Sequence, residues 1–520
     1  MAQYLMAIDA GTGSVRAVIF DTGGNQLGVS QREWEHREDL RYPGSMDFDW
    51  VQNWDLAVHC VKDVLAESGI RPADIAGIAT TSMREGIVLY DESGKEIWAC
   101  ANVDARAAAE VVQLKNISPH LEEEIYGPSG QTFALGALPR ILWVKNHLPE
   151  LYEKTRTITM FNDWLIAKLT GRLTSEPSNG CTTGIFDLGE RVWLPEIAAK
   201  CGLKDDIFPP VYESGTIAGA VSPACASRTG LAEGTPVVTG GGDAQLGCVG
   251  VGLVESNQGA VFGGSFWQYE FNTDRVIPDP HCSARINCHA VPGLWQYEAI
   301  AFFPGLVMRW YRDAFCQAEK KQGEDAGIDP YVIMNEEAAK IPAGCHGMLC
   351  TFSDVMNFIN WKHAAPSFMN FALNPEKFNK YTFYRALMEN AALVTKGNIE
   401  TVYRITGKRP NEIVFANGAS KSPLWCQILA DVLGIPVKVP KVKEATALGA
   451  AITAGIGVGI YKNLSQAAKS LVQWDSQYVP SAENHKVYNE LYAVWRQVYK
   501  NSLELTNLDL TTPMWAAPGL

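Results

Sequence analysis

The sequence predicts an α/β protein made of two related halves with a cleft between them. Short apolar strands alternate with helices along the chain, which is typical of the α/β class. A strand, a glycine-rich turn and a second strand open the chain, and residues 260–270 weakly repeat this pattern. The chain has 520 residues, whereas a single hydrophobic core stops growing near roughly 250–300 residues. We therefore expect a duplicated fold with one such hairpin in each half.

The first half begins with a predicted strand at 4–8, a turn at 9–14 and a strand at 15–20. Glycine, serine and aspartate favour the turn, and the apolar runs beside it favour buried strands. Two further buried strands are expected at 75–80 and 86–90. Helices are predicted at 54–68, 139–146, 163–169 and 193–201.

The second half follows a glycine-dense stretch, 234–252, which is the best candidate for a domain boundary. We expect one domain at 1–247 and another at 248–520. A strand at 412–415 leads through the turn 416–421 into a helix at 423–433, so the turn lies at a helix N-terminus, where anions and nucleotides bind. Other helices are predicted at 305–315, 383–403, 445–454 and 483–505, the third of them rich in small residues that allow tight packing.

The composition excludes several classes of protein. Hydrophobic residues make up 47% and charged residues 19%, which is typical of a globular protein and not of a disordered or fibrous one. The net charge of −13 argues against nucleic acid as the main partner. We expect no signal peptide and no membrane-spanning segment, and the twelve scattered cysteines indicate reduced thiols in a cytoplasmic protein.

The first loop combines groups that bind phosphate. Its backbone N–H groups, the hydroxyls of Thr12 and Ser14 and the guanidinium of Arg16 suit a phosphate chain. The carboxylate of Asp9, at the start of the loop, suits the water shell of Mg²⁺. The sequence has no GxxxxGK[ST] motif, so this is not a P-loop. The alternative is an ordinary hairpin turn, in which aspartate and glycine are common.

A second group of motifs lies near the expected boundary. Asp243 follows three glycines and a valine-rich strand, and a carboxylate placed there can accept a proton from a hydroxyl nucleophile. The segment 263–265, Gly-Gly-Ser, can hold a second phosphate. A plain turn is the alternative in both places.

Two charged pairs lie in the first half. Arg84 and Glu85 lie between two buried strands, where they can reach into a cleft and bind a polyol. Asp104 and Arg106 allow the same interpretation. The alternative for each is an ion pair on the surface.

The order of these motifs resembles that of FGGY-family carbohydrate kinases over essentially the whole chain. The resemblance includes the stretches 161–165, 309–313 and 444–451. It implies an α/β fold with two actin-like (ribonuclease H-like) ATPase domains and a cleft between them. It also implies transfer of phosphate from ATP to an alcohol with the help of Mg²⁺.

The resemblance also implies the roles of individual residues. Asp243 would be the catalytic base, and Asp9 and Asp243 would hold the metal. Substrate binding is implied for Arg84, Glu85, Asp104 and Asp243. ATP binding is implied for Thr12, Gly13, Ser14, Arg16, Gly264, Ser265, Gly305, Arg309, Gly418, Ala419 and Ser422.

Closer similarity points to one substrate. The stretches 82–90, 98–106 and 363–368 resemble the autoinducer-2 kinase subfamily. That resemblance implies phosphorylation of linear autoinducer-2, (S)-4,5-dihydroxypentane-2,3-dione, at its C5 hydroxyl. Some relatives are controlled by phosphocarrier proteins of the sugar phosphotransferase system, so such a protein is an expected partner.

Departures from the family pattern leave alternatives open. Asn417 and Ala419 flank Gly418 where relatives usually have adjacent glycines, which adds bulk beside adenosine. Leu135 and Ala244 replace an aromatic residue and a glutamine of glycerol kinases, which argues against glycerol. The alternatives are a kinase for another small polyol or ketose, such as a pentulose, and an ATP-binding regulatory protein without transferase activity.

Overall fold

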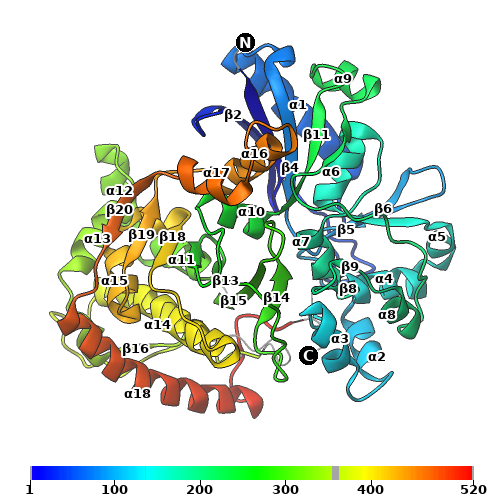
Figure 1. The fold of residues 1–520 in the computed structure, drawn as a ribbon. Helices are drawn as coiled ribbons and strands as arrows, with labels where there is room; N and C mark the ends of the chain where they lie inside the picture. Colours follow the sequence, from blue (N-terminus) through cyan, green and yellow to red (C-terminus); the bar gives the residue numbers. More distant parts are fainter. Residues whose placement is uncertain (1–2, 135, 302, 354–361, 518–520) are drawn as a thin grey trace.

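The structure is a computed structural model that describes residues 3–134, 136–301, 303–353 and 362–517. Within these ranges the chain forms two large β-sheets, one in each half, with helices packed against their faces (Figure 1). The α/β class with two related halves is therefore confirmed. In the described residues, no helix is both long and apolar enough to cross a membrane.

The first sheet has the strand order β10-β11-β4-β1-β2-β3. Its strands are β1 (Tyr4–Ala10), β2 (Ser14–Asp21), β3 (Gln26–Glu33), β4 (Ile75–Ser82), β10 (Ile217–Ala220) and β11 (Pro236–Gly242). Strands β1, β2 and β3 are antiparallel neighbours, whereas β1, β4 and β11 run parallel. The helices α1 (Trp50–Ser68), α6 (Phe161–Thr170) and α9 (Pro223–Thr229) complete this core. Helix α1 begins where the Asp49 side chain accepts a hydrogen bond from Gln52 N, and it ends at Gly69 in the left-handed conformation.

The second sheet has the order β14-β15-β13-β12-β18-β19-β20. Its strands are β12 (Gly259–Gly263), β13 (Trp267–Thr273), β14 (Arg285–Cys288), β15 (Trp295–Ala301), β18 (Ile413–Ala416), β19 (Val437–Pro440) and β20 (Trp474–Tyr478). Strands β12, β13 and β15 are antiparallel neighbours, and β12, β18 and β19 run parallel. The run β15-β13-β12-β18-β19 thus repeats the run β3-β2-β1-β4-β11 of the first sheet. This repeat is the duplication that the two hairpins predicted.

Helices cover the second sheet, and smaller elements surround both sheets. The second half contains α11 (Pro304–Phe315), α12 (Gln317–Ala326), α13 (Pro330–Ala339), α14 (Lys380–Thr406), α15 (Pro423–Leu433), α17 (Leu464–Leu471), α18 (Ala482–Asn507), β16 (Leu349–Cys350) and β17 (Phe368–Met369). An additional unit of the first half contains β5 (Ile87–Tyr90), β6 (Glu96–Cys100), β7 (Thr157–Met160), α2 (Ala108–Lys115), α3 (Leu121–Ser129), α4 (Ala137–His147), α5 (Pro149–Lys154), α7 (Pro177–Gly180), α8 (Pro195–Lys200), β8 (Phe186–Asp187) and β9 (Val192–Trp193).

Two helices join the halves. Helix α10 (Asp243–Gly250) follows β11 directly, and α16 (Ala445–Gly457) packs against it and against β1 and β4, although it belongs to the second half of the chain (Figure 1). A Cβ atom on Gly250 would lie 1.8 Å from the Ala445 carbonyl oxygen, and one on Gly449 would lie 1.9 Å from that of Leu246. Only glycine permits this approach, which confirms the tight packing expected of the small-residue helix. Helix α16 thus packs on the first sheet although it follows the expected domain boundary. The boundary between the domains at residues 247/248 stays a prediction.

Several predicted boundaries were wrong. The helix expected at 54–68 already begins at Trp50. The turn expected at 9–14 is shorter, because Asp9 and Ala10 continue β1 and Ser14 already starts β2. The helix expected at 193–201 begins only at Pro195, and Trp193 pairs with Phe186 in a short antiparallel ladder. Proline is favoured in the first turn of a helix, which explains the later start.

Candidate functional site

Three parallel strands bring distant residues of the first half together. The register places Ala10 beside Ser82, and Ser82 beside Gly242, at the carboxyl ends of β1, β4 and β11. Asp9 directly precedes Ala10 in β1. Arg84 lies two residues after Ser82, and Asp243 directly follows Gly242. Ligands of open α/β sheets bind at this edge, so the fold itself assembles the predicted residues.

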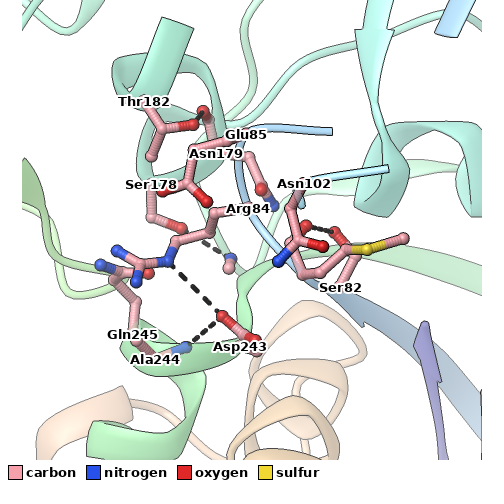
Figure 2. Close-up of polar contacts among 12 residues, drawn as sticks. Ser82, Arg84, Glu85, Asn102, Ser178, Asn179, Thr182, Asp243, Ala244 and Gln245 are labelled. Atoms are coloured by element: carbon pink, nitrogen blue, oxygen red, sulfur yellow. Dashed lines mark hydrogen bonds and ion pairs between the residues drawn. The ribbon is translucent and has the colours of Figure 1, made fainter. Parts of the chain in front are cut away.

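Asp243 is the first residue of α10. Its Oδ1 atom accepts a hydrogen bond of 2.8 Å from Ala244 N and lies 3.5 Å from Arg84 Nε (Figure 2). The side chain is 40% exposed, so the second oxygen can be reached by a ligand. The protein packed around the carboxylate raises its pKa to about 6, although Arg84 opposes this rise. A carboxylate with such a pKa is ionised at neutral pH and is suited to accept a proton.

Asp9 lies beside Asp243 with part of its carboxylate unpaired. Arg16 Nε is 3.3 Å from Asp9 Oδ2, and Arg16 Nη1 is 2.5 Å from Glu444 Oε2. Asp9 Oδ1 has no hydrogen-bond partner among the described residues. The pKa of Asp9 is raised to about 7, mainly by burial and also by the charges of Asp243 and Glu444, although Arg16 opposes the rise. This surplus of negative charge fits a hard cation.

The first loop presents its tip outward. Trp34 Nε1 donates to the carbonyl oxygens of Gly11 and Thr12 at 3.1 Å, and Asn102 Nδ2 donates to Thr12 Oγ1 at 3.0 Å. Gly13 is exposed, and in the described chain no atom lies within 4 Å of a Cβ atom added to it. These contacts fix the loop through the carbonyl oxygens and the Thr12 hydroxyl and leave its tip at Gly13 accessible. Ser14, by contrast, is buried and its hydroxyl accepts from Gln31 Nε2 at 3.2 Å.

Arg84 and Glu85 do not form a surface ion pair. Both side chains are buried, and each pairs with a residue of the second half. Arg84 Nη2 lies 2.5 Å from Glu298 Oε2, and Glu85 Oε1 lies 2.8 Å from Arg285 Nη1. Glu85 also has a φ of 63°, in the left-handed region that non-glycine residues rarely adopt. The predicted substrate residues are therefore held by a network that joins the halves.

Buried polar groups without partners lie around Asp243 (Figure 2). Among the described residues, Arg84 Nη1, Asn102 Oδ1, Gln245 Oε1 and both polar atoms of the Asn179 amide make no hydrogen bond. Buried polar groups are normally hydrogen-bonded, so these atoms suit a small ligand with several oxygens. The roles of Asn179 and Gln245 were not predicted, because an isolated amide in the sequence gives no signal.

The structure does not favour Asp104 as a direct ligand. Its carboxylate accepts from Met46 N at 2.6 Å and from the backbone and Nε of Arg106, and no part of the side chain is exposed. Arg106 in turn lies over the rings of Trp98 and Trp143. Asp104 therefore stabilises the loop that carries Asn102. Leu135, the other position considered for the substrate, lies outside the described residues.

A cavity of about 470 Å³ lies in the second half, which is a suitable size for a small molecule. It is lined by every second-half residue predicted to bind ATP: Gly264, Ser265, Gly305, Arg309, Gly418, Ala419 and Ser422. Tyr331, Tyr384, Met388 and Trp425 add apolar surface that was not predicted. The sequence motifs of the second half thus converge on one pocket.

Backbone contacts shape this pocket. A Cβ atom on Gly305 would lie 2.0 Å from the Gly264 carbonyl oxygen, so the start of α11 touches the second loop directly. Asn417, which precedes Gly418, has a φ of 73° and a ψ of −163°, a conformation that is essentially restricted to glycine. The turn keeps the shape of a glycine turn despite the asparagine. Ser422 caps α15 by accepting from Trp425 N at 3.2 Å.

Comparisons with known proteins identify the family of the chain. The models of the FGGY family of carbohydrate kinases match at residues 4–250 (N-terminal domain) and 273–458 (C-terminal domain). The chain is 52% identical to an autoinducer-2 kinase of Enterobacter sp. (strain 638) over 518 residues, covering 99% of this chain and 98% of that one. It is 51% identical to an autoinducer-2 kinase of Klebsiella pneumoniae, covering 99% and 97%.

Solved structures show the same fold at low sequence identity. A xylulose kinase from Rhodospirillum rubrum matches with a TM-score of 0.84 at 22% identity, covering 98% of this chain and 100% of that one. A gluconate kinase from Lactobacillus acidophilus matches with a TM-score of 0.87 at 19% identity, with the same coverage. The chain therefore belongs to the FGGY family of carbohydrate kinases.

Proposed function

We propose that this protein transfers the γ-phosphoryl group of ATP to the C5 hydroxyl of linear autoinducer-2, (S)-4,5-dihydroxypentane-2,3-dione. The main support is the accessible carboxylate of Asp243, which lies among buried polar groups without hydrogen-bond partners in the described residues. The chain is also about half identical to proteins named autoinducer-2 kinase. Use of ATP follows from the kinase family. The phosphorylated signal is the expected product.

Asp243 acts as the base in this proposal. Its free oxygen accepts the proton of the C5 hydroxyl, the hydroxyl oxygen forms a bond to the γ-phosphorus, and the bond to the β–γ bridging oxygen breaks to release ADP. The transition state of phosphoryl transfer is loose, so positioning and charge neutralisation contribute most of the acceleration. In this proposal Arg84, Asn179 and Gln245, whose unpaired polar atoms lie near Asp243 (Figure 2), bind the other oxygens of the dione. Glu85 supports them through Arg285, and Asp104 acts indirectly through the Asn102 loop.

The nucleotide is proposed to span both halves. Adenosine occupies the cavity against Gly418, Ala419 and Ser422, with Gly305 and Arg309 nearby. Its phosphates lie between two loops, one with Gly264 and Ser265, the other with Thr12, Gly13, Ser14 and Arg16. Closure of the two loops around the phosphates would exclude water, which otherwise competes with the alcohol.

Asp9 and Asp243 are the residues that would hold Mg²⁺. The unpaired Asp9 Oδ1 atom and the raised pKa of Asp9 fit this role. In the described residues no cluster of three or more metal-ligating side chains occurs, which suits Mg²⁺, since it commonly takes one or two carboxylates with phosphate oxygens and water. When bound, the ion would neutralise charge on the phosphates.

Two narrower points remain proposals. A cytoplasmic location fits the twelve cysteines, each of which is free and buried. Control by a phosphocarrier protein of the sugar phosphotransferase system rests only on the behaviour of some family members. A regulatory protein without activity is disfavoured, because a nucleotide switch does not need a base surrounded by unpaired polar groups.

The second candidate is a kinase for another small polyol or ketose. It would use the same Asp243, and it fits the FGGY family of carbohydrate kinases equally well. ADP release with Mg·ATP should be measured for the dione, xylulose, ribulose, erythritol and glycerol. Release that depends on the dione supports the proposal. Preference for another acceptor would replace the substrate, and no turnover with any acceptor despite ATP binding would favour the regulatory alternative.

A further inference from the structure

A buried ion pair connects the second half of the chain to Arg84. Glu298 lies in β15, and its Oε2 atom is 2.5 Å from Arg84 Nη2. On its other side, Arg84 Nε lies 3.5 Å from Asp243 Oδ1. The Arg84 side chain is only 4% exposed and that of Glu298 is 0% exposed. One guanidinium therefore bridges the proposed base and an acid contributed by the other half.

We infer that Glu298 is a positioning residue, which fixes Arg84 against Asp243 and so makes the acceptor site depend on both halves. This inference rests on the proposed function. A buried guanidinium without its carboxylate partner would be unpaired and free to take other rotamers, since its Nη1 atom already lacks a hydrogen bond among the described residues. Charge-assisted hydrogen bonds are short and directional, so they set orientation as well as charge.

Glu298 lies between two arginines, which favour its ionised form. Arg285 Nη1 lies 3.5 Å from Glu298 Oε1 and 2.8 Å from Glu85 Oε1, so acids and bases alternate from Asp243 to Glu85. Burial disfavours the charge of Glu298, but Arg84 and Arg285 outweigh it and lower its pKa. Removing this one carboxylate would therefore leave Arg84 without its acid from the second half, whereas Arg285 would keep its 2.8 Å contact with Glu85.

Glu270 provides a matched control on the next strand. It lies directly opposite Glu298 in the β13–β15 ladder and is equally buried. Unlike Glu298, it forms no ion pair with an arginine in the described part of the chain, and its protonated carboxyl group donates a hydrogen bond to Glu298, which a glutamine amide can also do. Burial and the neighbouring charge of Glu298 raise its pKa well above the usual range, so Glu270→Gln removes no negative charge.

The experiment compares Glu298→Gln and Glu270→Gln with the wild type, using the dione as acceptor. We expect Glu298→Gln to lower kcat/KM for the dione by about tenfold or more while the KM for ATP stays within about twofold. Glu270→Gln should remain within about twofold of the wild type in both parameters. Equal losses in the two variants would indicate a merely structural role and overturn the inference. An active wild type and an equally active Glu298→Gln variant would overturn it as well.

A double-mutant cycle tests whether Glu298 acts through Arg84. In an Arg84→Gln background, adding Glu298→Gln should change kcat/KM for the dione by less than about twofold, because the group it positions is already gone. Fully additive losses would contradict the inference. If Glu298→Gln does not fold, Glu298→Asp replaces it, because this change keeps the charge but shortens the side chain. The kcat/KM of this variant for the dione is then compared with that of the wild type in the same way. An inactive wild type with the dione would instead contradict the proposed function.

Discussion

The Arg84 Nε atom lies 3.5 Å from the Asp243 Oδ1 atom, although the two residues follow different strands of the first sheet. The pairing leaves the other oxygen of Asp243 free and orients it, since Ala244 N holds Oδ1 as well. The arrangement is that of a base whose direction is fixed before the substrate arrives. It predicts a selective defect when the carboxylate is removed.

Replacing Asp243 with asparagine should lower kcat by about 10³-fold, since general bases contribute about 10²–10⁴-fold. The affinity for ATP should remain nearly unchanged, because the adenosine cavity lies in the second half. Steady-state ADP release and calorimetric ATP binding measure the two quantities. Asp205→Asn, at an exposed position, is the control for loss of one carboxylate. Activity near that of the wild type would show that Asp243 is not the base.

The pH dependence of kcat/KM should show an acid limb. Asp243 accepts a proton only when it is ionised, and its pKa is raised to about 6, mainly because the protein packed around it removes water from the carboxylate. Activity should therefore be retained above this pH and fall as the pH decreases through about 6. Initial rates between about pH 5 and about pH 8 test this expectation. A rate that stays constant down to the acid end would contradict it.

The same shift affects stability in a defined direction. A carboxyl group with a raised pKa in the folded state binds a proton more tightly there than in the unfolded chain, so folding loses stability as the pH rises through this window. Asp243→Asn should therefore have a higher Tm than the wild type at neutral pH. The difference should shrink toward the usual pKa of aspartate. Thermal unfolding at neutral and acidic pH measures it, and a lower Tm at neutral pH would refute the expectation.

Gly305→Ala should raise the KM for ATP by about tenfold or more. The new methyl group would meet the Gly264 carbonyl oxygen at 2.0 Å, and backbone must move to avoid it. Alanine is the better helix former, so the loss would come from the collision and not from α11 itself. Gly189→Ala is the control, because its nearest neighbour is the end of the flexible Asp187 side chain. An unchanged KM for ATP in Gly305→Ala would show that the second loop does not contact the nucleotide.

Asn417→Gly should raise the free energy of unfolding by about 1 kcal/mol. The present φ of 73° and ψ of −163° strain any residue with a side chain by about 1–3 kcal/mol, and glycine offsets part of this gain through greater freedom in the unfolded chain. Asn116→Gly is the matched control, because its φ of −84° suits asparagine and the same change should destabilise the protein. Denaturant titration of both variants gives the comparison. Destabilisation by Asn417→Gly would mean that its side chain makes a compensating contact.

Local signals predict most of the fold and the loops of the site. Glycine turns between apolar strands mark both hairpins, and all second-half residues expected to bind ATP line one cavity. The end of β1 was misjudged, because the cross-strand pairing of Asp9 with Arg16 and their ion pair outweigh the low strand preference of aspartate. That compensation comes from a neighbouring strand and is not visible in the residues of the turn.

Long-range pairing explains what the sequence could not reveal. Glu298 and Arg84 are 214 residues apart, and nothing in either segment indicates its partner. Asp104 shows the opposite case: its carboxylate, in a motif that suggests a ligand, is engaged with Met46 and Arg106. Whether an acid faces a ligand or its own loop depends on packing between distant segments.

The contact between α10 and α16 fixes the two halves to each other at one point. Gly250 and Gly449 bring the two helix backbones together without side chains between them, so the helices cannot approach further. Asp243 is the first residue of α10, and its carbonyl oxygen accepts a hydrogen bond of 3.2 Å from Thr446 Oγ1 of α16. The proposed base therefore stands at the place where the backbones of the two halves are held closest together, and its position is fixed by both of them.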